Sequence, residues 1–230
     1  FSYKLETGED MEIDYLTSIV SDAFNQLSQG MSYWSGKWQE ECDPKDIRWG
    51  DDDSGKIKDD CINVIRAWRE AVFPNYIPLA VEERFEIPYD LDGFTISGRI
   101  DLRCSTKHID NILLDWKATE KSWPADRCHK EFSPYIYSLG YLALFDKLPA
   151  GFIFEVAATL KSGVKMESHL TKRSPEQIDK FFLHVIKPAF RMVTEGIFPA
   201  ALAGWTCSDK YCGYHADICQ AVKGAKSFVV

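Results

Sequence analysis

The sequence lacks any hydrophobic run long enough to cross a membrane. A transmembrane helix needs roughly 18 or more consecutive apolar residues, and no stretch of this 230-residue chain approaches that length. Its first residues carry no signal-peptide pattern either. We therefore expect a cytoplasmic protein without a membrane partner.

The sequence also lacks an excess of positive charge. Its 27 Lys and Arg residues are outnumbered by 35 Asp and Glu residues, which gives a net charge of −8. This balance excludes a protein that coats nucleic acid by charge alone. A nucleic-acid enzyme remains compatible, since metal-holding carboxylates add negative charge, but it needs a local basic surface. Candidates form two groups, which could equally be solvated surface charges: Lys117, Lys121, Arg127 and Lys130, and then Lys161, Lys165, Lys172 and Arg173.

Disulfide pairing is not expected. The chain has seven cysteines, an odd number, and no secretory signal, which favours a reducing compartment. Repeats and low-complexity segments are absent too, so the chain reads as one domain, 1–230. Within it we expect a helical and loop region 1–55, a core 56–197 and a cysteine-containing tail 198–230.

Hydrophobic periodicity predicts an α/β (α+β) fold. Helical spacing covers 12–27 and 57–72, on either side of a Trp-, Gly- and Asp-rich stretch, 30–55, that is typical of an irregular loop or a partly ordered excursion. Three strands, 81–87, 94–104 and 111–119, precede a helix within 126–146 that begins properly near Pro134. A hairpin, 151–160 and 164–170, and a helix, 174–194, complete the core. This order predicts a mixed sheet with helices on its faces.

Acidic residues recur in order on the three central strands. Asp115 and Lys117 lie two residues apart after the apolar run 112–114, so they point to the same face of their strand. Asp101 ends the preceding strand segment Gly98-Arg99-Ile100-Asp101, and Glu83 lies in phase with apolar residues of the first strand. Glu83 could instead belong to a wet edge strand.

These residue types suit a hard metal ion and a phosphate substrate. Mg²⁺ or Mn²⁺ takes oxygen ligands, which Asp101 and Asp115 supply, with Glu83 and the carbonyl of Trp116 as further candidates. Lys117 can hold an attacking water and offset developing negative charge. We therefore expect Asp101, Asp115, Lys117 and Glu83 to form a catalytic group.

The same residues resemble the PD-(D/E)XK nuclease superfamily, in its phage-type RecB-like exonuclease branch. That branch has a Gly-x-Ile-Asp run, an acidic-x-Lys run and then a helix with Gln-x-x-x-Tyr. Here Tyr141 matches the family Tyr and Tyr137 stands in place of Gln. The resemblance implies a restriction-endonuclease-like sheet, with Tyr137, Tyr141 and Lys121 on the DNA side. Both tyrosines could instead face the core. Asp59 replaces the His that relatives carry on an early helix, unless it is a first-turn residue favoured by the helix dipole.

The C-terminal tail also resembles phage-type RecB-like nucleases, in which three cysteines recur. Relatives join such a set to an upstream cysteine to hold a 4Fe–4S cluster. Here Cys207, Cys212 and Cys219 need a fourth ligand, for which Cys42, Cys61 and His215 are candidates. Four cysteines suit iron–sulfur and three cysteines with a histidine suit Zn²⁺, whereas unliganded packing of the tail is the alternative.

Together these features predict a Mg²⁺- or Mn²⁺-dependent deoxyribonuclease, an exonuclease rather than an endonuclease. The resemblance implies phage or bacterial DNA recombination in the bacterial or phage-infected host cytoplasm, with a single-strand-annealing or single-strand-binding partner. One rival is an inactive DNA-binding or assembly module of the same fold. The other is a metal-dependent phosphohydrolase with a different substrate.

Overall fold

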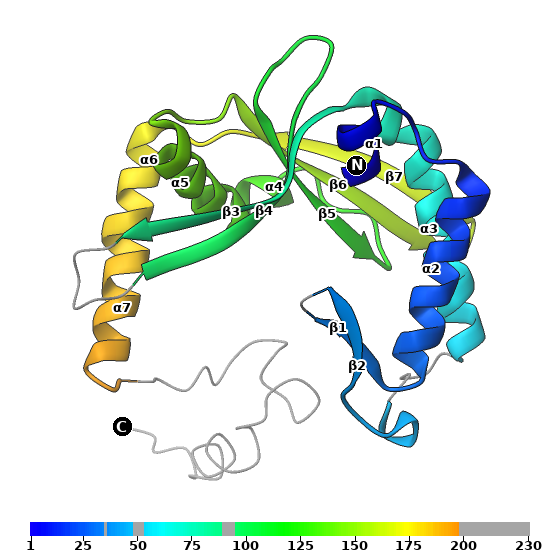
Figure 1. Cartoon of the computed structure of the whole chain (residues 1–230). Helices are drawn as coiled ribbons and strands as arrows, with labels where there is room; N and C mark the ends of the chain where they lie inside the picture. The colour runs from blue at the N-terminus through cyan, green and yellow to red at the C-terminus, as the bar shows by residue number, and fades with distance from the viewer. Residues whose placement is uncertain (35, 48–52, 89–94, 198–230) are drawn as a thin grey trace, which may run out of the picture. The chain divides into compact units, whose positions relative to one another are not determined.

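Five strands form a mixed sheet in the order β3-β4-β5-β6-β7 (Figure 1). The structure is a computed structural model that describes residues 1–34, 36–47, 53–88 and 95–197. The strands are β3 (Ile77–Pro88), β4 (Thr95–Ser105), β5 (Ile112–Thr119), β6 (Gly151–Leu160) and β7 (Gly163–Thr171). Only β5 and β6 run parallel, and the chain between them contains α4 (Arg127–Lys130) and α5 (Ser133–Phe145). A parallel pair needs such a crossover, so the predicted mixed sheet with flanking helices is confirmed.

The strand β5 is buried on both faces, because its apolar run serves two core clusters. Leu113 packs into the cluster that contains α5 residues, whereas Ile112 and Leu114 pack into the cluster beneath α3 (Ser54–Ala71). A strand covered on both sides reads as a continuous apolar run rather than an alternating one. The alternation still fixes Asp115 and Lys117 on the α5 side, the face that Leu113 shares.

Alternation breaks down in β3 and β4, contrary to expectation. The sequence pattern places Ile100 and Leu102 on one face, yet they pack into different core clusters. The cause is a kink at Glu82, which has φ of 53° and interrupts the pairing between Val81–Leu102 and Glu83–Ile100. A left-handed residue in a strand twists the ladder locally. The kink lies directly across from Asp101.

Helix α5 approaches the sheet closely because two glycines flank one aromatic ring. A Cβ on Gly98 of β4 would lie 2.4 Å from the Phe85 ring, and a Cβ on Gly140 of α5 would lie 2.5 Å from it. The ring therefore fits between strand and helix only because both positions lack a side chain. As predicted, α5 carries Pro134 in its first turn, where the missing N–H costs nothing.

The remaining helical elements are α1, α2, the single turns η1 and η2, and, after β7, α6, the π-helical turn η3 and α7. Their bounds are Ser2–Thr7, Ile13–Ser28, Pro44–Asp46, Phe73–Asn75, Pro175–Phe181, Phe182–Ile186 and Lys187–Thr194. The predicted continuous helix 174–194 is thus interrupted by η3. Residues 1–178 and 179–230 form two units, each considered by itself. Among the described residues, no helix has the length and apolar character to span a membrane.

The stretch 30–55, predicted to be an irregular loop or a partly ordered excursion, contains a short piece of regular structure. Residues Met31–Trp34 (β1) and Lys37–Glu40 (β2) form an antiparallel hairpin. Its turn carries Gly36 with φ of 83°, a conformation that glycine adopts without strain. The rings of Tyr33 and Trp38 pair across the two strands at 5.3 Å, a cross-strand contact that local composition did not reveal.

Candidate active site where two strands separate

The pairing between strands β4 and β5 ends next to the two aspartates. The strands pair only over Leu102–Cys104 on β4 and Ile112–Leu114 on β5. Asp101 and Asp115 occupy the next positions outward, directly across from one another in the same register. Because the ladder ends there, the two carboxylates lie at the opening of a fork rather than inside a continuous sheet.

Asp115 is the buried acid of this site. It is 3% exposed, and Lys117 Nζ lies 2.8 Å from its Oδ1 and 2.7 Å from its Oδ2. Its Oδ2 nevertheless has no hydrogen-bond partner with favourable geometry among the described residues. Burial, opposed by Lys117 and reinforced by the charge of Asp101, raises the pKa of Asp115 to about 6. The carboxylate is thus short of stabilising charge, as expected for a cation ligand.

Asp101 is oriented by the helix above it. The hydroxyl of Tyr137 on α5 donates a hydrogen bond to Asp101 Oδ1 at 3.1 Å. Burial, and then the negative charge of Asp101, raises the pKa of Tyr137 above its ordinary value, so the phenol stays a donor throughout the physiological range. Tyr137 therefore acts on Asp101, which composition alone did not indicate.

The donor set fits a small divalent cation. Asp101 and Asp115 present carboxylate oxygens from adjacent strands, and the buried Asp115 Oδ2 faces the Lys117 ammonium at 2.7 Å without a well-oriented hydrogen bond. Mg²⁺ is commonly held by one or two carboxylates with water and substrate phosphate completing the shell. In the described part of the chain, no group of three or more His, Cys, Asp or Glu side chains is arranged to hold a metal ion by itself.

The structure does not bring Glu83 to the two aspartates. Both of its carboxylate oxygens accept hydrogen bonds from Arg103, at 2.9 and 3.1 Å. The guanidinium of Arg103 also lies 4.7 Å from the ring centre of Phe145 on α5. Glu83 therefore ties β3, β4 and α5 together through Arg103, and its expected role as a ligand stays a prediction.

Two further residues were predicted to lie at the site, Tyr141 and Asp59. Tyr141 is 1% exposed and packs in the core beside Phe145, because its position on α5 faces the sheet; a direct contact with DNA is therefore corrected to a packing role. Asp59 is exposed on α3. Its neighbour Asp60 lines a recess with Leu160 at the far end of β6, so the counterpart of the family His is not at this site.

The polar loop after β5 is partly fixed by its own backbone. Lys121 is exposed, and its carbonyl accepts a hydrogen bond from the Thr119 hydroxyl at 2.7 Å. Cys42 and Cys61 are exposed free thiols. The tail cysteines Cys207, Cys212 and Cys219 lie outside the described residues, and so does His215.

Sequence reasoning missed a buried carboxylate, Glu155 on β6. It is 2% exposed and accepts hydrogen bonds from the hydroxyls of Tyr76 and Ser168. Burial raises its pKa, and these donors oppose the shift. The available signal was one acid inside the run Gly151–Leu160. The group lies on the α3 side of the sheet, behind the site, and links β6 to β7 and to Tyr76, the residue just before β3.

Comparison with known proteins identifies the class of fold. A family profile for the PD-(D/E)XK nuclease superfamily matches residues 13–220. The chain therefore belongs to the PD-(D/E)XK nuclease superfamily. No curated protein sequence matches the chain.

A solved structure shares the fold at low sequence identity. A crystal structure from Eubacterium rectale, described as a candidate exonuclease, has a TM-score of 0.50 and 11% identity, covering 96% of this chain and 79% of that chain. The crystal structure of SSO0001 has a TM-score of 0.37 and 15% identity, covering 60% of this chain and 58% of that chain. At these identities the likeness concerns the fold alone.

Proposed function

We propose that this protein is a Mg²⁺- or Mn²⁺-dependent deoxyribonuclease that hydrolyses phosphodiester bonds at the fork between β4 and β5. The observation that carries the proposal is the buried Asp115 carboxylate, which pairs with Lys117 and lies beside a second acid, Asp101, on the adjacent strand. A structural salt bridge alone would not require a second acid on the adjacent strand.

The two aspartates would hold the metal ion, together with the Trp116 carbonyl. When bound, a divalent cation supplies positive charge to the phosphate and acidifies water. The resting Lys117–Asp115 pair keeps an ammonium within the site, with the lysine side chain 37% exposed. That exposure lets Lys117 reach a water molecule and orient it toward phosphorus.

Hydrolysis adds a water oxygen to phosphorus and breaks the bond to the leaving sugar oxygen, which takes up a proton. Lys117 stabilises negative charge that develops on the phosphoryl oxygens, since a preformed ammonium in a half-buried site needs little reorganisation. Tyr137 holds Asp101 in orientation through its hydroxyl. Because its phenol stays neutral, it adds no competing charge near the substrate.

Within this activity we propose an exonuclease of the RecB-like type, acting in phage or bacterial DNA recombination in the cytoplasm. A single-strand-annealing or single-strand-binding protein is the partner we propose. Support comes from the order of the motifs along the chain and from the description of the Eubacterium rectale neighbour. The tail cysteines, with Cys42, stay a proposed iron–sulfur or zinc site.

Cleavage assays on linear and covalently closed circular DNA, with Mg²⁺ or Mn²⁺, test the proposal. Wild type should degrade the linear form, and Asp115→Asn should lose at least about a hundredfold in rate. Asp110→Asn is the matched control, because Asp110 is an exposed aspartate in the turn at the other end of β5. It should cleave like wild type.

Metal binding, measured by calorimetry with Mn²⁺, separates catalytic from structural loss. Asp115→Asn should bind Mn²⁺ more weakly than both wild type and Asp110→Asn. The proposal fails if wild type cuts neither DNA form while Asp115→Asn retains wild-type affinity for the ion. Cleavage of circular DNA at the linear rate would replace the exonuclease assignment by an endonuclease.

A further inference from the structure

A tryptophan from the loop after β5 covers the sheet next to the two aspartates. Asp115 pairs with Phe154 on β6, and Phe154 pairs with His169 on β7, so these three side chains share one face. The Trp123 ring lies 5.2 Å from the Phe154 ring and 5.8 Å from the His169 ring. Trp123 therefore covers the part of this row that begins one strand spacing, about 4.8 Å, from Asp115.

An arginine stacks on the outer side of this tryptophan. The guanidinium carbon of Arg127 lies 4.2 Å from the centre of the Trp123 ring. Trp123 thus contacts Phe154, at an interplanar angle of 52°, and Arg127, on the face of the sheet that holds Asp115 and Lys117. Arg127 is consequently a cation beside the site, one layer further out.

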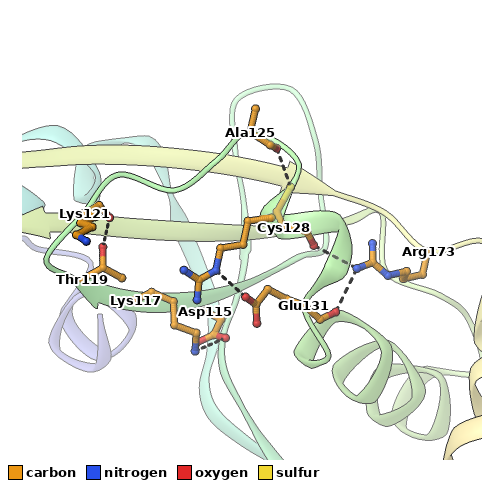
Figure 2. A network of polar contacts seen from close by, with 9 residues as sticks. Asp115, Lys117, Thr119, Lys121, Ala125, Cys128, Glu131 and Arg173 are labelled. Carbon is orange, nitrogen blue, oxygen red and sulfur yellow. Dashed lines mark hydrogen bonds and ion pairs between the residues drawn. The ribbon is translucent and has the colours of Figure 1, made fainter. Parts of the chain in front are cut away.

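The segment that carries Arg127 is tied to β7 at several points. Trp123 donates its backbone N–H to Glu167 Oε2 at 3.0 Å, and the Cys128 thiol lies 3.8 Å from the Leu170 carbonyl. Arg173, 5% exposed, donates through Nη2 to the carbonyls of residues 128, 129 and 131. Figure 2 shows Arg173 reaching Cys128 and Glu131, with Asp115 and Lys117 in the same view. The segment 123–131 is therefore held in place on β7 by contacts within the protein.

Arg127 keeps donors available at the surface. Its side chain is 48% exposed, and its Nε donates to Glu131 Oε1 at 2.9 Å. Within the described ranges of the chain, no acceptor is placed on its two terminal nitrogens. A planar guanidinium with two terminal NH₂ groups matches the oxygens of a phosphate, and its contact with the Trp123 ring reduces the freedom that binding must remove.

We propose that Arg127 binds a backbone phosphate of the DNA strand, next to the phosphate held at Asp101, Asp115 and Lys117. This inference rests on the proposed nuclease function and adds a substrate-binding residue to it. Arg127 provides the local basic contact that a chain of net charge −8 needs at its active site. Glu131 holds the guanidinium in place through Nε and leaves the terminal nitrogens to the substrate.

Binding of a fluorescent blunt DNA duplex, measured by anisotropy in Ca²⁺ over a range of KCl concentrations, tests the assignment. Arg127→Ala should weaken binding about ten- to a hundredfold, the size of a lost charge-assisted hydrogen bond. The negative slope of log K against log salt should also become less steep by about one, because one phosphate contact is lost. Arg127→Lys should keep the slope and bind less tightly than wild type, since it retains charge without the planar fork.

Arg66→Ala is the matched control, because it removes one exposed cation from α3, on the opposite side of the sheet. An Arg127→Ala slope equal to that of Arg66→Ala overturns the proposal, provided both variants melt like folded protein. If Arg127→Ala unfolds, the Arg127→Lys variant decides the question. Wild-type affinity for DNA in Arg127→Lys then excludes a contact that depends on the planar guanidinium. Failure of the nuclease function would appear separately, as DNA binding by wild type without cleavage of any DNA form.

Discussion

Replacing Gly140 by alanine tests how the helix reaches the active site. The new Cβ would lie 2.5 to 2.7 Å from three atoms of the Phe85 ring, whereas carbon atoms in contact prefer roughly 3.5–4.0 Å. Phe85 cannot retreat, because its other side lies against Gly98, where a Cβ would be 2.4 Å away. Helix α5 must therefore lift from the sheet, and Tyr137 must move away from Asp101 with it.

The expected magnitude follows from two opposed effects. Overpacking a dense core costs about 1–3 kcal/mol. Alanine in a helix interior recovers about 0.5–1 kcal/mol relative to glycine. The net loss in the free energy of unfolding should therefore lie between about 0 and 2.5 kcal/mol, centred near 1 kcal/mol. The rate of DNA cleavage should fall further than stability alone explains, because the 3.1 Å Tyr137–Asp101 hydrogen bond does not survive the shift.

Urea denaturation and a linear-DNA cleavage assay measure the two effects. The double variant Gly140→Ala/Phe85→Leu is the internal control, since a smaller residue at 85 makes room for the added methyl group. It should regain part of the cleavage rate relative to Gly140→Ala alone. Wild-type stability together with wild-type cleavage in Gly140→Ala would refute the packing argument, and so would the absence of any rescue.

Three further predictions concern the ionisable groups. Burial raises the pKa of Asp115 to about 6, so the metal-free protein should lose stability as pH rises from about 4 to 6. Above that range, Asp115→Asn in EDTA should be more stable than wild type by up to about 3 kcal/mol. Parallel profiles of stability against pH for the two proteins would contradict this. Lys165, followed by the Trp123 N–H and Ser122, lowers the pKa of Glu167 to about 2, so its contribution is complete above its ordinary pKa and disappears as pH falls toward 2. In thermal melts Glu167→Gln should therefore cost about 1–2 kcal/mol at neutral pH, after allowance for solvent screening of the exposed lysine, and almost nothing near pH 2. Arg103→Ala should cost about 2 kcal/mol in urea, because it leaves the half-buried Glu83 carboxylate without its cation; an unchanged midpoint would show that the pair is too solvated to matter.

Local sequence pattern determined much of the fold and of the site. Period-two alternation predicted that Asp115 and Lys117 share a face, and their 2.8 Å contact confirms it. The apolar run before Asp115 predicted a buried strand, because a central strand covered on both faces needs apolar residues at every position. Pro134 predicted where the helix begins. These features depend on neighbours a few residues apart, so the chain carries them directly.

Tertiary structure decided which distant side chains meet. The pairing of Glu83 with Arg103, the burial of Tyr141 and the stack of Arg127 on Trp123 all depend on how strands and helices cross. Simple alternation failed at the kink at Glu82, because one residue in the left-handed conformation reverses the faces to which the following side chains point. The sequence by itself thus determined the residue types at the fork, and only packing across the sheet decided which of them reach one another.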